Sequence, residues 1–340
     1  MYDLSQLICI FGMPRSGTTW VGKIFDSHPD TLYRHEPDSG RLRGGFLAGC
    51  IPLLAGREQG AALANDVAEI TKAMLATRNA RASGKTPFFP KSYLSALRFQ
   101  IRRLVASAVA AGSRIRPDLT IPDLVDNVAG ARIRPVWKSI NLVGCVGCLA
   151  AALAQARFIV IVRHPCGQVN SVLRGEAARK FTAATPASRD WGLYELLLNI
   201  PVAQKYGLVL ADIKAMEPVE RLTWRWVLFN EQAVIEARAL PNCRVIRYED
   251  ICERPLDQAR DLFAFVDLPW SHQAQAFVAA STQGGATGYY SVYKSPAVAA
   301  NKWRTELGPD KARKIMNIVG QTPLASLFNE GGENCPTDTP

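Results

Sequence analysis

The chain lacks the features that would mark it as secreted or membrane-spanning. Its N-terminus carries Asp3 and runs directly into a short apolar segment, without the basic region, longer apolar region and small-residue cleavage site of a secretory signal. The longest apolar stretch, Leu142 to Val162, is interrupted by Gln155 and Arg157, which predicts a buried helix and strand and no membrane span. We therefore expect a cytoplasmic protein.

Paired cysteines are nearly absent as well. Eight cysteines are scattered along the 340 residues, and only Cys145 and Cys148 have Cys-x-x-Cys spacing. Because there is no second pair and the neighbourhood is rich in Ala and Leu, we interpret these two as small apolar residues of a core helix. A redox or metal role for this pair is the alternative.

The charge is unbalanced toward positive, and it attracts anions. The formal net charge is +10, spread along the chain and not gathered in a tail. Basic-aromatic recognition motifs, zinc-finger spacing and a basic helix with heptads are all missing, so nucleic acid is not the favoured anion. A length of 340 residues and a hydrophobic content of 48% predict one large domain, or one domain with an insertion.

Apolar strand-like segments alternate with helical patterns along the chain. They are Leu7 to Phe11, Thr31 to Arg34, Arg134 to Lys138, Phe158 to Val162 and Arg244 to Tyr248. This alternation predicts an α/β fold in three layers, a parallel sheet like that of the P-loop NTPases with helices on both faces. Ligands of such sheets bind beyond the carboxyl ends of the strands, so the residues that follow these segments are expected at one site.

The stretch from Gly40 to Gly130 has no strand character and is interpreted as a helical insertion, at about residues 41–130. Helices are expected around Ala61 to Ala76 and Tyr93 to Ala111, with a loop near Ala82 to Pro90. Residues 1–328 are assigned to a single domain, and the polar tail 329–340 is expected to be disordered. The arginines of the second helix are expected on a solvated face, although contact with an anionic acceptor is the alternative.

One strand-to-helix junction carries most of the functional information. After the first apolar segment the chain reads Gly12-Met13-Pro14-Arg15-Ser16-Gly17-Thr18-Thr19-Trp20. Gly12 and Gly17 keep the glycine spacing of a nucleotide P-loop, but Thr18 replaces the lysine that reaches the β- and γ-phosphates. The following helix would still direct free amides at an anion, and Arg15 adds a fixed positive charge. The loop therefore predicts an activated anhydride other than ATP.

This segment resembles the 5′-phosphosulfate loop of sulfotransferases that use 3′-phosphoadenosine 5′-phosphosulfate (PAPS). A second family motif, a strand ending in Arg, then x-Pro, then Ser eight residues after the Arg, matches Arg163-His164-Pro165 and Ser171. The resemblance implies PAPS as co-substrate, no metal, and a 3′-phosphate site made by Arg163 and Ser171. It implies that the 5′ end is bound by Arg15, Ser16, Gly17, Thr18, Thr19 and Trp20.

The base of the reaction is expected at the end of the second strand. The segment Ser27 to Pro37 resembles the stretch after the P-loop helix in tyrosylprotein and carbohydrate sulfotransferases, where a strand ends in a glutamate. That resemblance makes Glu36 the base, and Pro37 keeps it out of helical geometry. His35 is a rival base because imidazoles titrate near neutral pH, but strand alternation is expected to point it away from the face of Glu36.

The third strand ends in Lys138-Ser139-Ile140-Asn141, where cytosolic small-phenol sulfotransferases carry Lys-Thr-His with the histidine as base. The lysine is kept and the histidine is missing, which places the chain closer to the carbohydrate and tyrosylprotein type. The resemblance implies that Lys138 neutralises the sulfuryl oxygens. An ordinary surface lysine at a strand end is the alternative.

Two later segments extend the resemblance. Arg247-Tyr248-Glu249-Asp250 resembles the family's strand end whose tyrosine contacts the cofactor nucleotide, and Asn301-Lys302-Trp303-Arg304 resembles the segment that closes over PAPS. The resemblance thus implies cofactor contacts from Tyr248, Lys302 and Trp303. The Arg-Lys-Gly run of the cytosolic branch is missing.

Together these motifs predict an enzyme that moves a sulfuryl group from PAPS to an acceptor hydroxyl and releases adenosine 3′,5′-bisphosphate. A carbohydrate or glycolipid is the favoured acceptor, on the basis of Glu36-Pro37 and the missing histidine; a protein tyrosine or a small metabolite stays open as the acceptor. Two alternatives stay open: a degenerate P-loop kinase or NTPase, which Thr18 and the lack of an obvious strand-end Asp for Mg²⁺ disfavour, and a PAPS-binding protein without turnover. Nothing in the sequence predicts the oligomeric state.

Overall fold

The computed structural model describes residues 3–38, 56–76, 133–179, 185–284 and 295–329, with the single residues 89, 91, 97, 100, 101, 104, 105 and 108. Within this part of the chain, five strands form one parallel sheet in the order β2-β3-β1-β4-β5. The strands are β1 Ile8–Phe11, β2 Thr31–His35, β3 Arg134–Ser139, β4 Arg157–Val162 and β5 Cys243–Arg247. Each predicted strand is confirmed to within one residue at either end.

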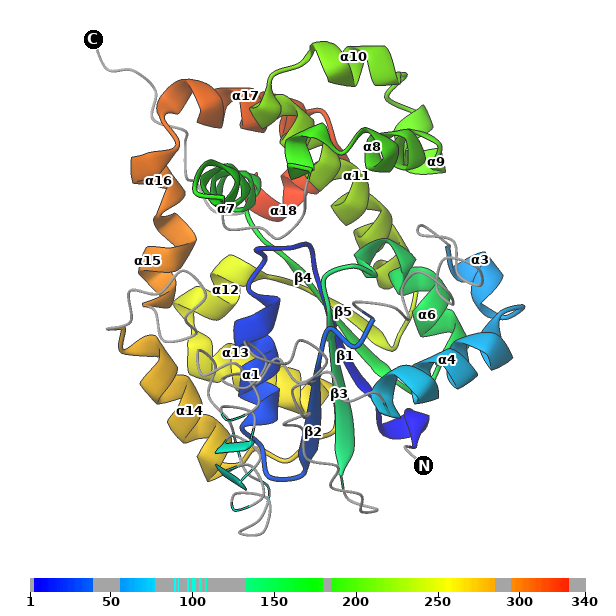
Figure 1. The fold of residues 1–340 in the computed structure, drawn as a ribbon, viewed down its shortest axis with the longest axis vertical. Coiled ribbons are helices and arrows are strands. Elements are labelled where there is room, and N and C mark those ends of the chain that lie inside the picture. The colour runs from blue at the N-terminus through cyan, green and yellow to red at the C-terminus, as the bar shows by residue number, and fades with distance from the viewer. Residues whose placement is uncertain are drawn as a thin grey trace.

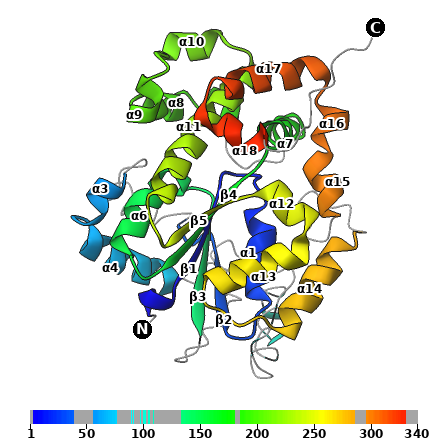
Figure 2. The same ribbon diagram turned by 180° about the vertical axis from the view of Figure 1, so that it is seen from behind.

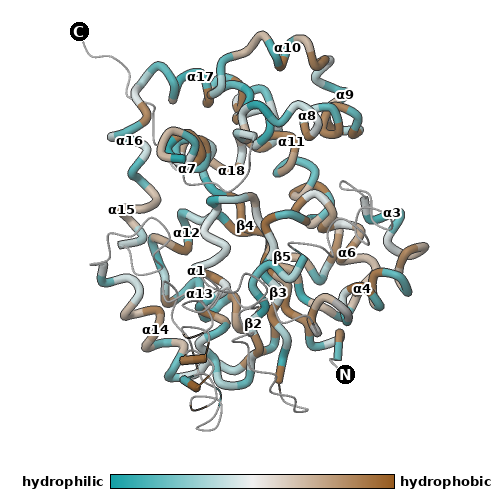
Figure 3. Tube along the Cα trace, in the orientation of Figure 1, coloured by the Kyte–Doolittle hydropathy of each residue, from teal (hydrophilic) through white to brown (hydrophobic). Residues whose placement is uncertain are grey.

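Side-chain alternation along the strands divides the core into two layers. On β1, Ile8 and Ile10 pack into one core and Cys9 and Phe11 into the other, and all four are fully buried. This arrangement requires an apolar residue at every strand position, which is why the strands read as continuous apolar runs. Strongly hydrophobic segments accordingly mark the strands at the centre of Figure 3.

Helices cover both faces of the sheet, as the three-layer prediction requires (Figures 1 and 2). Helices α1, α12, α13 and α14 contribute to the core that contains Ile8 and Ile10, and α4, α6, α7, α8, α11 and α17 to the core that contains Cys9 and Phe11. The α-helices are α1 Thr18–Asp26, α3 Arg57–Gly60, α4 Ala64–Ala76, α6 Val146–Ala152, α7 Pro165–Ala177, α8 Trp191–Leu198, α9 Pro201–Gln204, α10 Leu210–Ala215, α11 Pro218–Arg238, α12 Tyr248–Glu253, α13 Pro255–Phe265, α14 His272–Thr282, α15 Pro296–Asn301, α16 Trp303–Glu306, α17 Pro309–Gly320 and α18 Ser326–Asn329. Short 3₁₀ helices are Leu4–Gln6, Val143–Cys145, Ala187–Arg189 and Pro323–Ala325.

Part of the predicted insertion is described. Helix α4 confirms the first of its two expected helices, whereas most of Tyr93 to Ala111, the loop near Ala82 to Pro90 and the tail from 330 onward lie outside the described residues. The assignment of residues 1–328 to one domain stays a prediction. Among the helices described, none combines the length and the apolar character that a membrane crossing needs.

The Cys145-x-x-Cys148 pair lies in the core as predicted. Both side chains are fully buried, at and just after the start of α6. Burial raises the pKa of the Cys148 thiol, so it stays protonated and behaves as an apolar group.

Candidate active site

The loop between β1 and α1 has the backbone of an anion cradle. Arg15 and Gly17 adopt positive φ angles of 74° and 86°, which curl the chain so that successive amides face one side. The first turn of α1 closes with a bond from the Trp20 amide to the Gly17 carbonyl, 3.0 Å, so the amides before Trp20 precede the helical ladder. The Ser16 hydroxyl is fully buried and makes no hydrogen bond within the described residues. A buried hydroxyl without a partner suits a loop built to receive an anion.

Tyr248, the first residue of α12, sits directly against this loop. A methyl group added to Gly17 would collide with the Tyr248 ring, so the close approach requires glycine as well as the positive φ. Trp20 meets the same ring edge-on, with centroids 6.3 Å apart, and donates its indole N–H to Ser281 at 3.0 Å. Burial raises the pKa of Tyr248, so its hydroxyl stays neutral. The structure therefore brings Gly17, Trp20 and Tyr248 together.

The two family motifs are joined by direct hydrogen bonds. β1 and β4 are neighbours in the sheet, so the loop after β1 lies beside the start of α7. Arg15 Nε donates to Ser171 Oγ at 3.0 Å, Arg163 Nη1 donates to the Arg15 carbonyl at 2.8 Å, and Gln168 Nε2 donates to the Pro14 carbonyl at 3.0 Å. Gln168, which the sequence analysis missed, lies inside the second motif and clamps the loop from the same helix.

Arg163 is held on several sides. Its second terminal nitrogen, Nη2, donates to the Ala299 carbonyl of α15 at 2.7 Å, and its guanidinium lies 5.0 Å from the centre of the Tyr248 ring. Both terminal nitrogens thus bind main-chain oxygens, while the buried Nε has no partner among the described residues. The phosphate contact implied for Arg163 and Ser171 stays a prediction.

His164 places Trp303 next to Arg163. The two rings stack with centroids 4.7 Å apart and planes inclined by 9°. His164 also caps α7, since its Nδ1 accepts from the Cys166 amide at 3.2 Å. Burial, reinforced by Arg304, Arg247 and Arg163, lowers the pKa of His164 to about 3, so the ring stays neutral. Lys302, by contrast, is exposed and pairs with Glu306 at 3.2 Å.

On the other half of the sheet, Glu36 and Lys138 form a buried ion pair between Oε1 and Nζ. Glu36 follows the last residue of β2, and its amide extends the ladder by donating to the Lys138 carbonyl at 2.8 Å. Lys138 is only 1% exposed. The alternative of an ordinary surface lysine is therefore wrong, because a buried ammonium needs the partner that Glu36 provides.

The expected separation of His35 from Glu36 is also wrong. His35 Nε2 lies 3.6 Å from Glu36 Oε1. Strand alternation would have sent the two side chains to opposite faces, but Glu36 has a φ of 50°, which ends the extended strand and turns the carboxylate back. His35 and Lys138 are register partners on neighbouring strands, so both side chains already lie on that face.

Asp38, which the sequence analysis also missed, anchors the turn that carries Glu36. Its fully buried carboxylate accepts from Trp137 Nε1 at 3.1 Å, Ser139 Oγ at 2.8 Å and Asn141 Nδ2 at 2.9 Å. These bonds tie the segment after β2 to the end of β3. The available signal was an acid two residues beyond Glu36, facing polar residues at the end of the third predicted strand.

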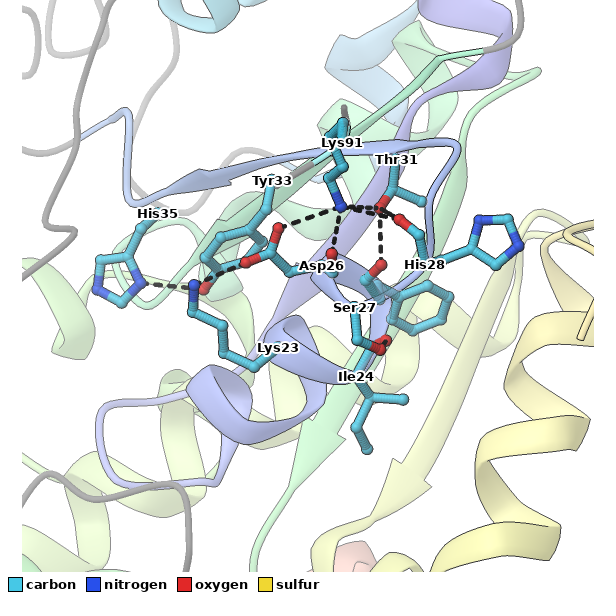
Figure 4. Close-up of polar contacts among 10 residues, drawn as sticks. Lys23, Ile24, Asp26, Ser27, His28, Thr31, Tyr33, His35 and Lys91 are labelled. Atoms are coloured by element: carbon cyan, nitrogen blue, oxygen red, sulfur yellow. Dashed lines mark hydrogen bonds and ion pairs between the residues drawn. The ribbon is translucent and has the colours of Figure 1, made fainter. Parts of the chain in front are cut away.

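The far end of α1 is fixed by Lys91, as Figure 4 shows. The buried Lys91 ammonium donates to the carbonyls of Asp26 and His28, the latter at 2.8 Å, and lies 3.6 Å from the Asp26 carboxylate. Lys23 pairs with the other carboxylate oxygen of Asp26 at 2.7 Å. A cation on the last carbonyls of a helix complements its dipole, so this cluster stabilises the helix whose first turn forms the anion cradle.

Metal-ligating side chains do not gather in the part of the chain that the structure describes: no group of three or more His, Cys, Asp or Glu there could hold an ion. The described residues bring together a main-chain cradle, the side chains of Arg15, Arg163 and Ser171 beside it, and a carboxylate paired with a lysine at the ends of β2 and β3. This arrangement can bind a phosphorylated anion and remove a proton from a neutral group.

Comparison with protein families gives a match to the model described as the sulfotransferase family, over residues 8–194. This range holds the loop after β1, Glu36, Lys138, Arg163 and Ser171. It exceeds half of the chain.

Among characterised proteins, carbohydrate sulfotransferase 3 of Homo sapiens is 32% identical over 86 residues, which is 25% of this chain and 18% of that protein. Carbohydrate sulfotransferase 3 of Mus musculus is 29% identical over 80 residues, 23% of this chain and 17% of that protein. The chain thus matches less than a fifth of the length of these relatives.

Among solved structures, the sulfotransferase domain from the curacin biosynthetic pathway aligns over 92% of this chain and 96% of its own, with 15% identity and a TM-score of 0.43. The sulfotransferase domain from the Synechococcus PCC 7002 olefin synthase aligns over 93% and 96%, with 14% identity and a TM-score of 0.42.

Proposed function

Because the chain belongs to the sulfotransferase family, we propose that it transfers a sulfuryl group from PAPS to an acceptor hydroxyl and releases adenosine 3′,5′-bisphosphate. The observation that carries this proposal is the pair of hydrogen bonds beside the cradle after β1, from Arg15 to the Ser171 hydroxyl and from Arg163 to the Arg15 carbonyl. We assign one phosphate to the loop amides and the other to Ser171 and Arg163, because a nucleotide phosphorylated at both ends requires two such places.

The chemistry assigns a separate task to each group. The acceptor oxygen forms a bond to sulfur, the bond from sulfur to the 5′-phosphate oxygen breaks, and the acceptor proton passes to Glu36. Arg15 and the loop amides stabilise the negative charge that develops on the departing phosphate. Lys138 neutralises the sulfuryl oxygens, and its contact with Glu36 in this structure keeps base and ammonium beside each other.

We further propose a carbohydrate or glycolipid acceptor. Three features support it: the Glu36-Pro37 strand end, the lack of a histidine at Ser139 to Asn141, and the partial similarity to carbohydrate sulfotransferase 3. A protein tyrosine is the acceptor to test against. Mass spectrometry after incubation with PAPS and a library of glycans, glycolipids and peptides distinguishes them by which member gains a sulfo group.

Glu36→Gln tests the base directly. It keeps the shape and removes the basic oxygen, so we expect turnover to fall by about 10²–10⁴-fold while calorimetric affinity for adenosine 3′,5′-bisphosphate stays within about twofold. Glu195→Gln, at an exposed position of α8, is the matched control and should be silent.

Other outcomes identify the alternatives. Unchanged turnover of Glu36→Gln would move the base elsewhere. Bisphosphate binding without transfer to any acceptor would favour a binding protein, and metal-dependent hydrolysis of ATP without bisphosphate binding would favour a P-loop NTPase.

A further inference from the structure

Four side chains form a line on the α1 face of the sheet, from the interior of β2 through the proposed base to the end of β3. The Tyr33 hydroxyl lies 2.9 Å from His35 Nδ1, His35 Nε2 lies 3.6 Å from Glu36 Oε1, and that oxygen contacts Lys138 Nζ. Figure 4 shows the Tyr33 hydroxyl pointing at the His35 ring. Both ring nitrogens of His35 are therefore directed at protein groups, which leaves Glu36 as the member of the line that can meet an acceptor.

The Tyr33 hydroxyl is placed to select which nitrogen of His35 carries the proton. Burial raises the pKa of Tyr33, and the carboxylates of Asp26 and Glu36 raise it further, so the hydroxyl stays protonated. A phenol O–H that donates to Nδ1 requires the neutral ring to carry its hydrogen on Nε2, the nitrogen that faces Glu36. Lys23, whose ammonium lies 4.9 Å from the centre of the Tyr33 ring, helps to hold the phenol in place.

Glu36 needs such a donor once the sulfuryl group is present. The proposed function, on which this step rests, directs the Lys138 ammonium to the sulfuryl oxygens and so weakens its hold on Glu36. The carboxylate must then stay in position while it accepts a proton, and a misplacement of about 1 Å can cost about 10²-fold in rate. We infer that His35 is a positioning residue that holds the Glu36 carboxylate through Nε2–H, with Tyr33 fixing the tautomer of the imidazole.

Three substitutions of His35 separate this role from others. The side-chain amide of H35Q can place an N–H near the position of Nε2, that of H35N places one near Nδ1, and H35A places none. A hydrogen bond to a charged group corresponds to about 10- to 150-fold, so we expect H35A and H35N to lower kcat by about tenfold or more, with the KM for PAPS little changed. H35Q should recover to within about threefold of the wild-type kcat.

Two outcomes would overturn the inference. If H35A keeps kcat within about twofold of wild type, His35 does not hold the base. If H35Q is as slow as H35A, ionisation of the imidazole matters and not its N–H. Calorimetric binding of adenosine 3′,5′-bisphosphate by each variant checks that the donor site is folded.

Tyr33→Phe tests the second link. It removes the hydroxyl that selects the tautomer, so kcat should fall several-fold in the wild-type background. In H35Q, whose side chain has no tautomer, the same substitution should have no further effect. An equal loss in both backgrounds would mean that Tyr33 acts independently of His35.

The tautomer can be measured without any turnover. The chain has four histidines, so ¹⁵N-histidine labelling gives a simple spectrum in which H35Q assigns His35. We expect His35 as the Nε2–H tautomer at neutral pH, with partial conversion in Tyr33→Phe. A predominant Nδ1–H form would overturn the inference. Since this result does not depend on sulfuryl transfer, failure of the proposed function and failure of the tautomer assignment are distinguishable.

Discussion

Two single backbone angles determine how the site is assembled at the scale of the residue. The φ of 86° at Gly17 opens the anion cradle, and the φ of 50° at Glu36 turns the carboxylate toward Lys138. A left-handed conformation costs an L-residue about 1–2 kcal/mol, so Glu36 is held there by its surroundings. The hydrogen bond from the Glu36 amide to the Lys138 carbonyl and the three hydrogen bonds that Asp38 accepts supply that constraint.

Gly17→Ala should damage both folding and donor binding. Alanine pays the left-handed penalty and its methyl group collides with the Tyr248 ring, so we expect the free energy of unfolding to fall by about 2 kcal/mol or more. Affinity for adenosine 3′,5′-bisphosphate should fall by about tenfold or more, because the cradle must shift. Urea denaturation and calorimetry measure the two effects.

Gly192→Ala is the matched control, since nothing lies within 4 Å of the added methyl group. It lies in α8, where alanine favours the helix by up to about 1 kcal/mol. Wild-type affinity and stability in Gly17→Ala would show that the loop does not use this conformation.

The sequence was sufficient for some residues of the candidate site and not for others. Glu36 and Lys138 could be proposed because each follows a recognisable strand. The contact of His35 with Glu36 could not be predicted, because strand alternation assumes an extended backbone. The positive φ that ends the strand occurs at Glu36, which is not a glycine and so gives no signal of it in the sequence. Asp38 was not identified from the sequence because its three partners come from β3 and the residues just after it, 99 to 103 residues away.

At the scale of the element, the decisive contact is between the loop after β1 and the junction of β4 with α7. Arg163 donates one hydrogen bond to the Arg15 carbonyl and another to the Ala299 carbonyl of α15. One guanidinium therefore links two strand ends to a helix that comes more than 130 residues later. The placement of both motifs after strand ends predicted that they belong to one site, but not that they hold each other.

Arg163→Ala should consequently loosen the proposed donor site even before the phosphate contact proposed for Arg163 is counted. Hydrogen bonds from a charged group contribute about 1.5–3 kcal/mol each, so we expect affinity for adenosine 3′,5′-bisphosphate to fall by about 10- to 150-fold or more. Titration calorimetry measures this loss. Arg238→Ala, at the exposed end of α11, is the matched control, and equal affinity in both variants would contradict the assignment.

At the scale of the whole molecule, stability depends on keeping His164 neutral. Its pKa of about 3 in the folded protein is far below the ordinary value of 6.5. Between these values the unfolded chain binds a proton that the folded chain does not, so the free energy of unfolding falls as the pH falls through this range. Well above pH 6.5, where the ring is neutral in both states, it contributes no pH dependence.

Linkage gives the size of this effect. Between pH 7.5 and pH 5, His164 should lower the free energy of unfolding by about 2 kcal/mol. His164→Asn keeps an oxygen to cap α7 and removes the titrating group. Over the same pH range, the free energy of unfolding of this variant should therefore fall by about 2 kcal/mol less than that of the wild type. Chemical denaturation at several pH values measures the difference between the two slopes. Parallel slopes would show that the ring is not kept neutral by the fold.

For the molecule as a whole, the alternation of strands and helices predicted the α/β class and the parallel sheet. It did not predict the order β2-β3-β1-β4-β5, because that order depends on how the crossover helices pack on each face. The order nevertheless explains why motifs at residues 12, 36, 138 and 163 meet: all five strands run in one direction and end at one edge.

This strand order also has a consequence for engineering. The groups assigned to the nucleotide lie at the ends of β1, β4 and β5, whereas the pair assigned to proton removal lies at the ends of β2 and β3, on the other half of the sheet. Under the proposed function, libraries that vary the residues around the ends of β2 and β3 should change which hydroxyl is modified and leave the groups assigned to the nucleotide intact.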